Sequence, residues 1–490
     1  MGLWSRKTLE RCAQQAFSEQ QPRLQRSLGI VSLTAFGVGS TIGAGIFSLT
    51  GEVAARHTGP AISLAFLLAS VACFLAGLCY AELATLVPIS GSAYSYTYVA
   101  FGELPAWIVG WSLTLEWLFS ISVVAVSWSG YTTAALHDVG IGLPAALIAA
   151  PLRLDPQGHL VFAGTWVDLP AMLVVLGCTL LLLIGTGASA RINTAIVLAK
   201  VTVLILFIVL GAQLIQPGNW KPFIPANTGS FGQFGWSGVL QGAATVFFAY
   251  LGFDGVSTLA EDARNPQRTV PWSLFASLAV CTLVYVGVSL TVTGLVDYRQ
   301  LAVPDPLYRA LSASTAALTL FRYALALIAV VGLVSVILTC ILGQVRIFYA
   351  MARDGLLPGR FAQLGGRDRT PRVATVVTGA GAALLAGVTP LEVLGELVSI
   401  GTLLAFAIVC FAVVAMRRIA PGAPRAFRIP WVPALPIAGA LTCIGLMVTL
   451  PPATWIRLAV WTAVGLLIYA TYGARKSRRS DARSDSLERA

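Results

Sequence analysis

The sequence predicts an all-α polytopic membrane protein with about twelve transmembrane helices. Hydrophobic residues make up 57% of the chain and charged residues only 11%, and the mean hydropathy is +0.80. A soluble domain carries about 25% charged residues. The apolar residues fall in runs of about 20, the length that a helix needs to cross a hydrocarbon core about 30 Å thick. The runs do not alternate as the ten-residue strands of an outer-membrane barrel do.

The apolar runs follow one another along nearly the whole chain. Their approximate bounds are 29–50, 59–82, 102–126, 168–188, 192–214, 236–259, 272–296, 316–348, 372–389, 393–415, 430–450 and 454–473. The longest expected outer connection is 135–167. We expect one membrane domain, 29–475, between a cytoplasmic N-terminal segment, 1–28, and a disordered basic tail, 476–490.

The positive charge of the chain predicts its orientation. The net charge is +11, and about three quarters of the 32 lysines and arginines fall in connections on one side of the membrane. This bias predicts that both termini are cytoplasmic and that the protein lies in the plasma membrane. It also argues against a nucleic-acid partner. No cleavable signal peptide is evident, and the eight cysteines form no CxxC pair, so we expect neither a disulfide framework nor a metal site.

Two of the runs contain glycines that would interrupt a helix. The first run holds GVGSTIGAGIF, from Gly37 to Phe47, and in the sixth run Gly252 and Gly255 flank Asp254. Glycine inside a helix costs about 1 kcal/mol relative to alanine. The two runs are five spans apart, so a five-span repeat would cross the membrane in opposite directions. Interrupted spans at matching positions predict an inverted-repeat transporter with a site near the midplane.

A broken helix leaves backbone groups that need partners. The N–H groups of Gly43, Ala44 and Gly45, at the positive end of a half-helix, suit a carboxylate. The freed carbonyls of the sixth run suit an ammonium group; they belong to Phe248, Ala249 and Leu251. An α-amino acid carries both charges about 3 Å apart, so it could satisfy both breaks.

At these residues the chain resembles the amino acid–polyamine–organocation superfamily, and within it the cationic amino acid transporter family. The resemblance covers roughly residues 25–475. The stretches that carry it are GVGSTIGAGIF, CYAELATLVPISGSAYSYTYVAFGE, FFAYLGFDGVSTLAEDARNPQRTVP and GQVRIFYAMARDGLLP. It implies ten core helices in a five-plus-five inverted repeat, with discontinuous helices 1 and 6 and two extra C-terminal helices. Twelve spans are typical of a bacterial member, because animal members carry two more.

The resemblance also implies roles for individual residues. It assigns the substrate carboxylate to Thr41, Gly43, Ala44 and Gly45. It assigns the α-amino group to the main-chain oxygens of Phe248, Ala249 and Leu251, and makes Phe248 a candidate gate over the pocket. An ordinary packed phenylalanine is the alternative for that ring. Ile337 is similar in position to residues that shape the side-chain pocket.

Lys200 is an unusual residue in its span, RINTAIVLAKVTVLILFIVLG. If the helix starts near Arg191, Lys200 lies about 13 Å deep at 1.5 Å per residue, where reaching back to the interface is difficult. Arginine supplies most of the positive charge of this chain. Arginine keeps its proton, whereas a buried lysine can release it. We therefore expect Lys200 to tie the fifth span to freed carbonyls of the first when it is protonated, and to couple transport to protons.

Two acids are further candidates. Glu116 lies well inside the third span, where an unpaired carboxylate costs at least about 2–3 kcal/mol. We expect it to face the pocket or Lys200 and to take part in proton coupling, with a structural hydrogen bond as the alternative. Asp254 is a weaker candidate, because it could equally cap the half-helix that follows it.

Other functions fit the sequence less well. We expect no catalytic residues, because no span combines histidine with carboxylates or cysteines. No P-loop motif points to an ATP-driven pump, and no filter signature points to a channel. The expected function is proton-coupled symport of small neutral or cationic L-amino acids. The alternatives are a proton-independent cationic facilitator or exchanger, and an amino acid sensor without flux. No cofactor is expected, the partners are the substrate, protons and lipid, and the sequence carries no signal of oligomeric state.

Overall fold

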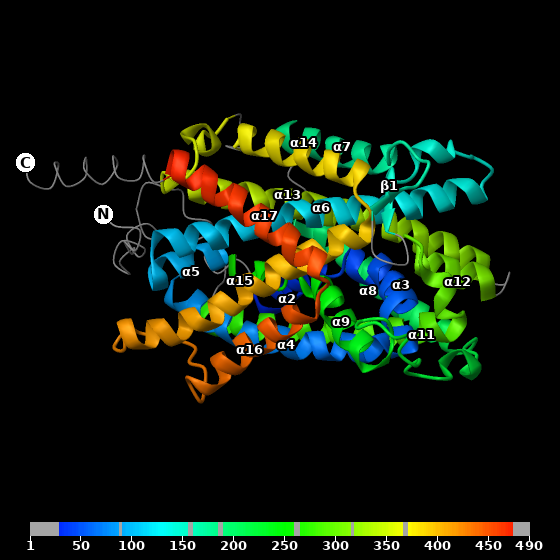
Figure 1. Ribbon diagram of the computed structural model, residues 1–490, viewed down its shortest axis with the longest axis horizontal. Coiled ribbons are helices and arrows are strands. Elements are labelled where there is room, and N and C mark those ends of the chain that lie inside the picture. The colour runs from blue at the N-terminus through cyan, green and yellow to red at the C-terminus, as the bar shows by residue number, and fades with distance from the viewer. Residues whose placement is uncertain are drawn as a thin grey trace, which may run out of the picture.

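The computed structural model describes residues 29–87, 91–154, 160–184, 190–258, 265–314, 318–365 and 371–473. These residues form a bundle of long helices that run roughly side by side (Figure 1). The first half contains α2 (Ile30–Thr41), η1 (Gly45–Leu49), α3 (Thr50–Val53), η2 (Ala54–Thr58), η3 (Gly59–Ala61), α4 (Ile62–Leu86), α5 (Ser92–Phe101), α6 (Glu103–Asp138), η4 (Ala145–Leu147), β1 (Leu152–Leu154), β2 (Leu160–Phe162), α7 (Leu169–Ile184), α8 (Ala190–Ala212) and η5 (Pro217–Trp220).

The second half continues the helical bundle. It contains α9 (Gly235–Val246), η6 (Phe247–Tyr250), α10 (Gly255–Thr258), α11 (Pro266–Leu295), η8 (Tyr298–Leu301), α12 (Pro306–Ser314), α13 (Thr319–Arg353), η10 (Gly359–Ala362), α14 (Arg372–Val388), α15 (Leu391–Ile419), α16 (Ala434–Thr449), α17 (Pro452–Ile468) and η11 (Tyr469–Gly473). The sequence therefore predicted the helical class correctly.

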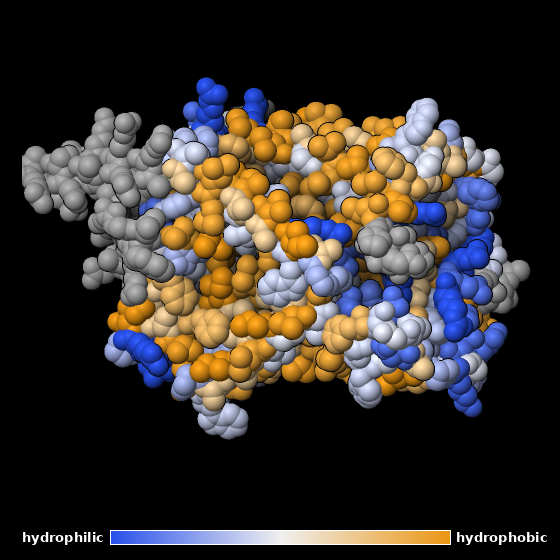
Figure 2. All heavy atoms as spheres, viewed as in Figure 1, coloured by the Kyte–Doolittle hydropathy of each residue, from blue (hydrophilic) through white to orange (hydrophobic). Residues whose placement is uncertain are grey.

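Length and composition identify the membrane-crossing helices. Within the described residues, 7 helices are long and apolar enough to cross a membrane, and four shorter apolar helices accompany them. The face of the bundle shown in Figure 2 is largely hydrophobic, and hydrophilic residues gather towards its ends. Exposed apolar side chains such as Leu283 (75%) and Leu180 (58%) would be unfavourable in water but suit lipid. The fold is that of a polytopic membrane protein.

The connection expected at 135–167 contains helical turns and two short strands among its described residues. Helix α6 continues to Asp138, so that His137 belongs to its last turn. Strands β1 and β2 then pair antiparallel, with Leu152 opposite Phe162. A separate bridge joins Ile148 to Asp168. Three-residue strands carry too little alternation to be recognised from a sequence.

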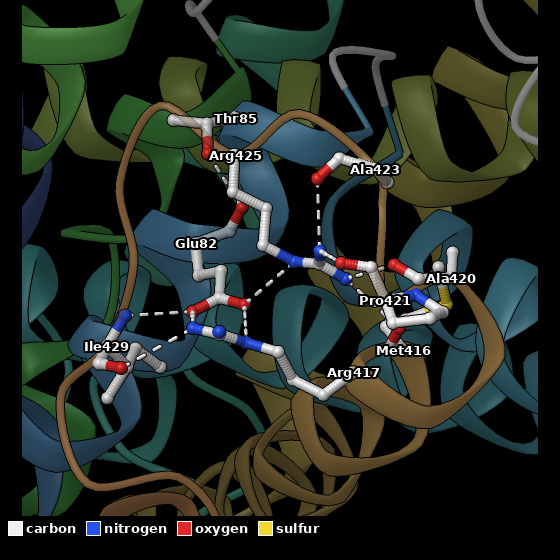
Figure 3. Close-up of polar contacts among 9 residues, drawn as sticks. All are labelled: Glu82, Thr85, Met416, Arg417, Ala420, Pro421, Ala423, Arg425 and Ile429. Carbon is white, nitrogen blue, oxygen red and sulfur yellow. Dashed lines mark hydrogen bonds and ion pairs between the residues drawn. The ribbon is translucent and has the colours of Figure 1, made fainter.

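One carboxylate joins α4 to the end of α15 (Figure 3). Glu82, in the last turns of α4, accepts two hydrogen bonds from Arg417, at 2.7 and 2.8 Å. It also accepts the backbone N–H of Ile429 at 2.9 Å and pairs with Nε of Arg425 at 3.2 Å. The Glu82 carboxylate is nearly inaccessible to water, so its negative charge is balanced by these donors.

Replacing Glu82 with alanine is expected to lower the free energy of unfolding by about 3 kcal/mol, because it leaves the buried guanidinium of Arg425 without its counter-ion. Thermal unfolding of the purified protein in detergent, followed by the fluorescence of a thiol dye, measures the change. The control is Asp297→Ala, which removes the acid of a solvent-accessible ion pair with Arg299 and should shift the unfolding midpoint little. Equal midpoints for the two variants would contradict the assignment of a stabilising role to Glu82.

Candidate functional site

The first membrane helix is interrupted where the sequence places its glycines. Helix α2 ends at Thr41, and Ile42 takes an extended ψ of 94°. The chain turns again into helix at Ala44 and continues as the π-helix η1 from Gly45. The first N–H groups of a helix have no acceptor within it and carry the positive end of the helix dipole. The break therefore presents backbone donors inside the bundle.

The sixth run is interrupted in the same way. Helix α9 tightens into the 3₁₀ turn η6 and ends with Leu251 in an extended conformation, at ψ 139°. Gly252 then adopts a φ of +104°, which a residue with a side chain rarely takes. Asp254 directly precedes the short helix α10. The glycine is needed for this turn, and the tight end of α9 directs carbonyl groups into the protein.

The two breaks contact each other through glycine. A Cβ on Gly45 would lie 2.4 Å from the Cα of Ala249, and one on Gly252 would lie 2.7 Å from the carbonyl oxygen of Ser40. The Ser40 hydroxyl donates to the carbonyl of Gly252 at 3.0 Å. Only residues without a side chain allow backbone atoms to approach this closely. The donors of one break and the acceptors of the other thus lie in one place.

Tyr285 of α11 joins the two breaks. Its hydroxyl lies 2.9 Å from the carbonyl oxygen of Thr41 and 2.7 Å from that of Ala249. The hydroxyl has one hydrogen, so it is shared between two acceptors. Sequence analysis missed Tyr285, because a single tyrosine in an apolar run carries no pattern that separates it from a packing residue.

Changing Tyr285 to phenylalanine is expected to reduce the transport rate about fivefold, because a net hydrogen bond is worth about 1 kcal/mol and both break carbonyls lose their donor. Initial uptake into proteoliposomes measures the rate. The half-buried Tyr349, changed to phenylalanine, is the matched control. An unchanged rate in the Tyr285 variant would show that the hydroxyl has no part in the site.

Lys200 reaches the first break from α8. It is 0% exposed, and its Nζ donates to the carbonyls of Gly39 at 2.8 Å and Ile42 at 3.0 Å. Gly332 on α13 makes room for it, since a Cβ there would lie 2.5 Å from the lysine Cδ. The contact with first-span carbonyls is the one that the sequence suggested. The ammonium group meets these carbonyls rather than the carboxylate of Glu116.

Glu116 is buried beside Thr402. It is 0% exposed, and neither carboxylate oxygen has a hydrogen bond of good geometry within the described part of the chain. An unpaired carboxylate at this depth is costly, so the group needs a proton or a cation beside it. Asp254, by contrast, accepts the Ser92 hydroxyl at 3.5 Å. Its position before α10 fits the capping alternative as well as a functional one.

The remaining predicted residues line the two breaks or lie close by. Phe248 is 5% exposed, and its carbonyl already accepts the N–H of Leu251 at 2.9 Å. A Cβ at Gly43 would lie 3.4 Å from Cγ1 of Val336, which is on α13. Val336, the neighbour of Ile337, therefore faces the first break. Ile337 itself is fully buried.

The residues at the two breaks are buried in this structure. Thr41 is 3% exposed, and its hydroxyl oxygen is buried without a hydrogen bond among the described residues. The two breaks therefore combine a buried hydroxyl, the N–H groups of a helix start and a buried acid. These features are suited to a small molecule that carries both a carboxylate and an ammonium group.

Comparisons with known proteins all find permeases and transporters. A sequence model of the family described as amino acid permease matches residues 28–471. The methylthioribose transporter of Bacillus subtilis (strain 168) is 42% identical over 477 residues, which are 97% of this chain and 98% of that protein. The branched-chain amino acid permease BcaP of the same organism is 41% identical over 464 residues, 94% of this chain and 96% of that protein. The vacuolar cationic amino acid transporter 4 of Arabidopsis thaliana is 38% identical over 400 residues, 81% of this chain and 64% of that protein.

Proposed function

This chain belongs to the amino acid permease family, and from that premise we propose that it carries L-amino acids across the plasma membrane by proton symport. Membership makes it a transporter rather than an enzyme. The direction of its termini and its membrane are part of the proposal, and rest on the bias of lysine and arginine between the two sides.

The observation that carries the proposal is the meeting of two broken helices. The helix start at Ala44 offers N–H groups, and the turn after η6 offers carbonyls, with Gly45 against Ala249. A zwitterion can satisfy both, whereas an anion or a cation alone would satisfy one. Thr41, Gly43, Ala44 and Gly45 would hold the substrate carboxylate. The carbonyls that would hold its ammonium group are those of Phe248, Ala249 and Leu251.

Tyr285 would take part in substrate binding. Its hydroxyl donates to the Ala249 carbonyl, which the substrate ammonium would use. An incoming ammonium would therefore share that carbonyl with the hydroxyl, or displace it towards Thr41. Binding would thus change the contact that joins the two breaks.

Alternating access would use a five-plus-five inverted repeat of core helices with two more at the C-terminal end. The interruptions in the first and sixth runs support this arrangement, because they lie five spans apart. Phe248, which lies at the break in the sixth run, would act as the gate over the bound substrate.

Proton coupling would act through Lys200. Its ammonium group holds the carbonyls of Gly39 and Ile42, immediately before the predicted carboxylate-binding residues. Loss of the proton would remove the charge that strengthens both hydrogen bonds and would loosen the first break. Glu116, which is buried and has no ion-pair partner among the described residues, would be a second proton-binding group. The chain would then bind its substrate and change access according to the protons that it carries.

The preference for one substrate side chain over another must come from groups other than the backbone at the breaks. The backbone recognises only the groups that all amino acids share. Relatives are named as a branched-chain amino acid permease, a cationic amino acid transporter and a methylthioribose transporter. The enclosed and mostly apolar surroundings, with Val336 and Phe248 beside the breaks, favour small neutral amino acids. Methylthioribose has no zwitterion, so the N–H and carbonyl ends argue against it as the main substrate.

Uptake into proteoliposomes tests the function. Labelled alanine, leucine, arginine and methylthioribose are offered with and without an inward proton gradient. We expect alanine to accumulate only with the gradient. Arginine uptake that ignores the gradient would replace the proposal with a cationic facilitator or exchanger. A sodium requirement with a rate independent of pH would contradict proton coupling.

Counterflow distinguishes a carrier from a sensor. Vesicles preloaded with unlabelled alanine should exchange it for labelled alanine outside. Binding without counterflow, measured on the same preparation, would show that the chain senses amino acids instead of transporting them.

A further inference from the structure

The connection between α15 and α16 holds more positive charge than the fold requires. Arg417 and Arg425 both pair with one acid, Glu82 (Figure 3), and Arg428 lies close enough to Arg425 to lower its pKa. Burial lowers the pKa of Arg425, Glu82 raises it, and Arg417 and Arg428 lower it again. The three guanidinium groups therefore repel one another, and one carboxylate balances only one of them.

The donors of Arg425 are already used. Its Nη1 bonds the carbonyls of Pro421 and Ala423, and its Nη2 those of Met416 and Ala420. These bonds close the C-terminal end of α15. Arg425 thus sets the shape of the connection and is not available to a ligand.

Arg417 and Arg428 have donors to spare. Arg417 uses Nε and Nη2 on Glu82, which leaves Nη1 unassigned, and its side chain is 25% exposed. Arg428 is exposed and has no ion-pair partner in the described part of the chain. Nη2 of Arg417 also bonds the carbonyl of Ile429, the residue that follows Arg428 in the chain. The guanidinium of Arg417 therefore lies next to the backbone that carries the exposed Arg428, and a guanidinium can bind a phosphate through two N–H groups.

A topological role does not account for this arrangement. Arginines that only orient a membrane protein need to be on the correct side and in water. Here one guanidinium is withdrawn from water and two others are held close to it, which costs free energy through mutual repulsion. A bound anion would relieve that repulsion.

The same connection carries a tryptophan that points to lipid. Trp431 is 79% exposed and adopts a φ of +50°, which is strained for a bulky residue. Tryptophan favours the headgroup region of a bilayer. The exposed side chain lies three residues from Arg428, and an indole there is suited to the headgroup layer in which phospholipid phosphates lie.

An apolar path leads from the connection into the membrane. The ring of Phe427 contacts Phe275 of α11 at 6.0 Å, and Phe275 contacts Phe74 of α4 at 5.4 Å. Phe74 is 46% exposed and Val71, one turn away, is 53% exposed. This surface faces lipid, and it continues from the arginines along the length that acyl chains would occupy.

We propose that Arg417 and Arg428, with Trp431 beside them, bind the phosphate of an anionic phospholipid whose acyl chains lie along the exposed face of α4. The inference goes beyond the proposed transport activity, because it concerns the exposed face of α4 and the connection after α15 rather than the two breaks. A free phosphate ion has the same charge but would gain nothing from Trp431 or Phe74. The continuous apolar path is the reason for choosing the lipid.

The test measures lipid binding to the purified full chain in neutral detergent. Phosphatidylglycerol or phosphatidylcholine is added, and native mass spectrometry counts the lipids bound. A shift in the unfolding temperature serves as a second readout. The variants are Arg428→Gln and Trp431→Ala. The control is Arg360→Gln, which removes the same charge from another exposed connection on the same face.

We expect the wild type and the Arg360 variant to prefer phosphatidylglycerol. The Arg428 variant should bind it about fivefold more weakly, because one arginine near a lipid surface contributes about that factor. The Trp431 variant should also bind more weakly. Equal binding of the two lipids, or equal loss in the Arg360 and Arg428 variants, would overturn the proposal. Full competition by inorganic phosphate at millimolar concentration would also overturn it, in favour of a free-anion site.

Discussion

Proteoliposomes that contain the Lys200→Met variant are expected to lose gradient-driven accumulation of alanine, with the ratio of inside to outside concentration falling to about 1. Methionine keeps the length and volume of the lysine stem but removes the two hydrogen bonds of its ammonium group. Bonds to a charged donor contribute about 1.5–3 kcal/mol each, so the initial rate should fall roughly a hundredfold. Uptake at a fixed inward proton gradient measures both quantities.

Two further variants separate the charge from the packing. Gly332→Ala would place a Cβ 2.5 Å from the Cδ of Lys200, so it displaces the ammonium group without removing it. We expect it to impair accumulation in the same direction as Lys200→Met. Lys221→Met removes a lysine from an exposed connection and should leave accumulation unchanged. If Lys200→Met still concentrates alanine against a gradient, Lys200 is a structural residue and the proton must bind elsewhere.

The second large effect is expected from Gly45→Ala. The new Cβ would meet the Cα of Ala249 at 2.4 Å, and backbone cannot turn aside as a side chain can. The two breaks must separate, which costs about 1–3 kcal/mol and moves the N–H donors away from the carbonyls. We expect alanine affinity to fall at least about tenfold. Isothermal titration or a scintillation proximity assay on the detergent-solubilised protein measures it.

A matched glycine controls for the substitution itself. Gly445 on α16 has open space around its Cα, so Gly445→Ala should leave alanine affinity unchanged. Purified yield and thermal unfolding show whether Gly45→Ala has folded. A folded Gly45→Ala protein that binds alanine as the wild type does would disprove the view that the two breaks form one site.

Lys200 and Gly45 act on neighbouring residues of the first span. Lys200 bonds the carbonyl of Ile42, which immediately precedes Gly43, and Gly45 contacts the second break. The carbonyl that Lys200 holds and the proposed carboxylate-binding N–H groups thus lie within residues 42–45 of the chain. A change at one end of this stretch is transmitted by backbone, with no intervening side chains.

The sequence by itself determined the class of the fold and the places where it breaks. Apolar runs of sufficient length predict membrane helices because lipid leaves the backbone no other partners. The glycines at Gly43, Gly45 and Gly252 predict the breaks because glycine weakens the interior of a helix. At Gly252 the φ of +104° is also one that other residues rarely adopt. Lys200 is recognisable because a charge deep in a span is rare.

Only the tertiary structure decided which residues meet. A soluble helix shows its buried face by its hydrophobic period, but a membrane helix is apolar on both faces. The hydrophobic pattern therefore does not show that Tyr285 bonds the carbonyls of Thr41 and Ala249. Nor does it show the space that Gly332 leaves for Lys200, or that Glu116 has no ion-pair partner among the described residues. The arginines around Glu82 are separated from it by more than 330 residues. Their mutual approach depends on how α4 packs against α15, and a linear pattern of apolar residues does not record that packing.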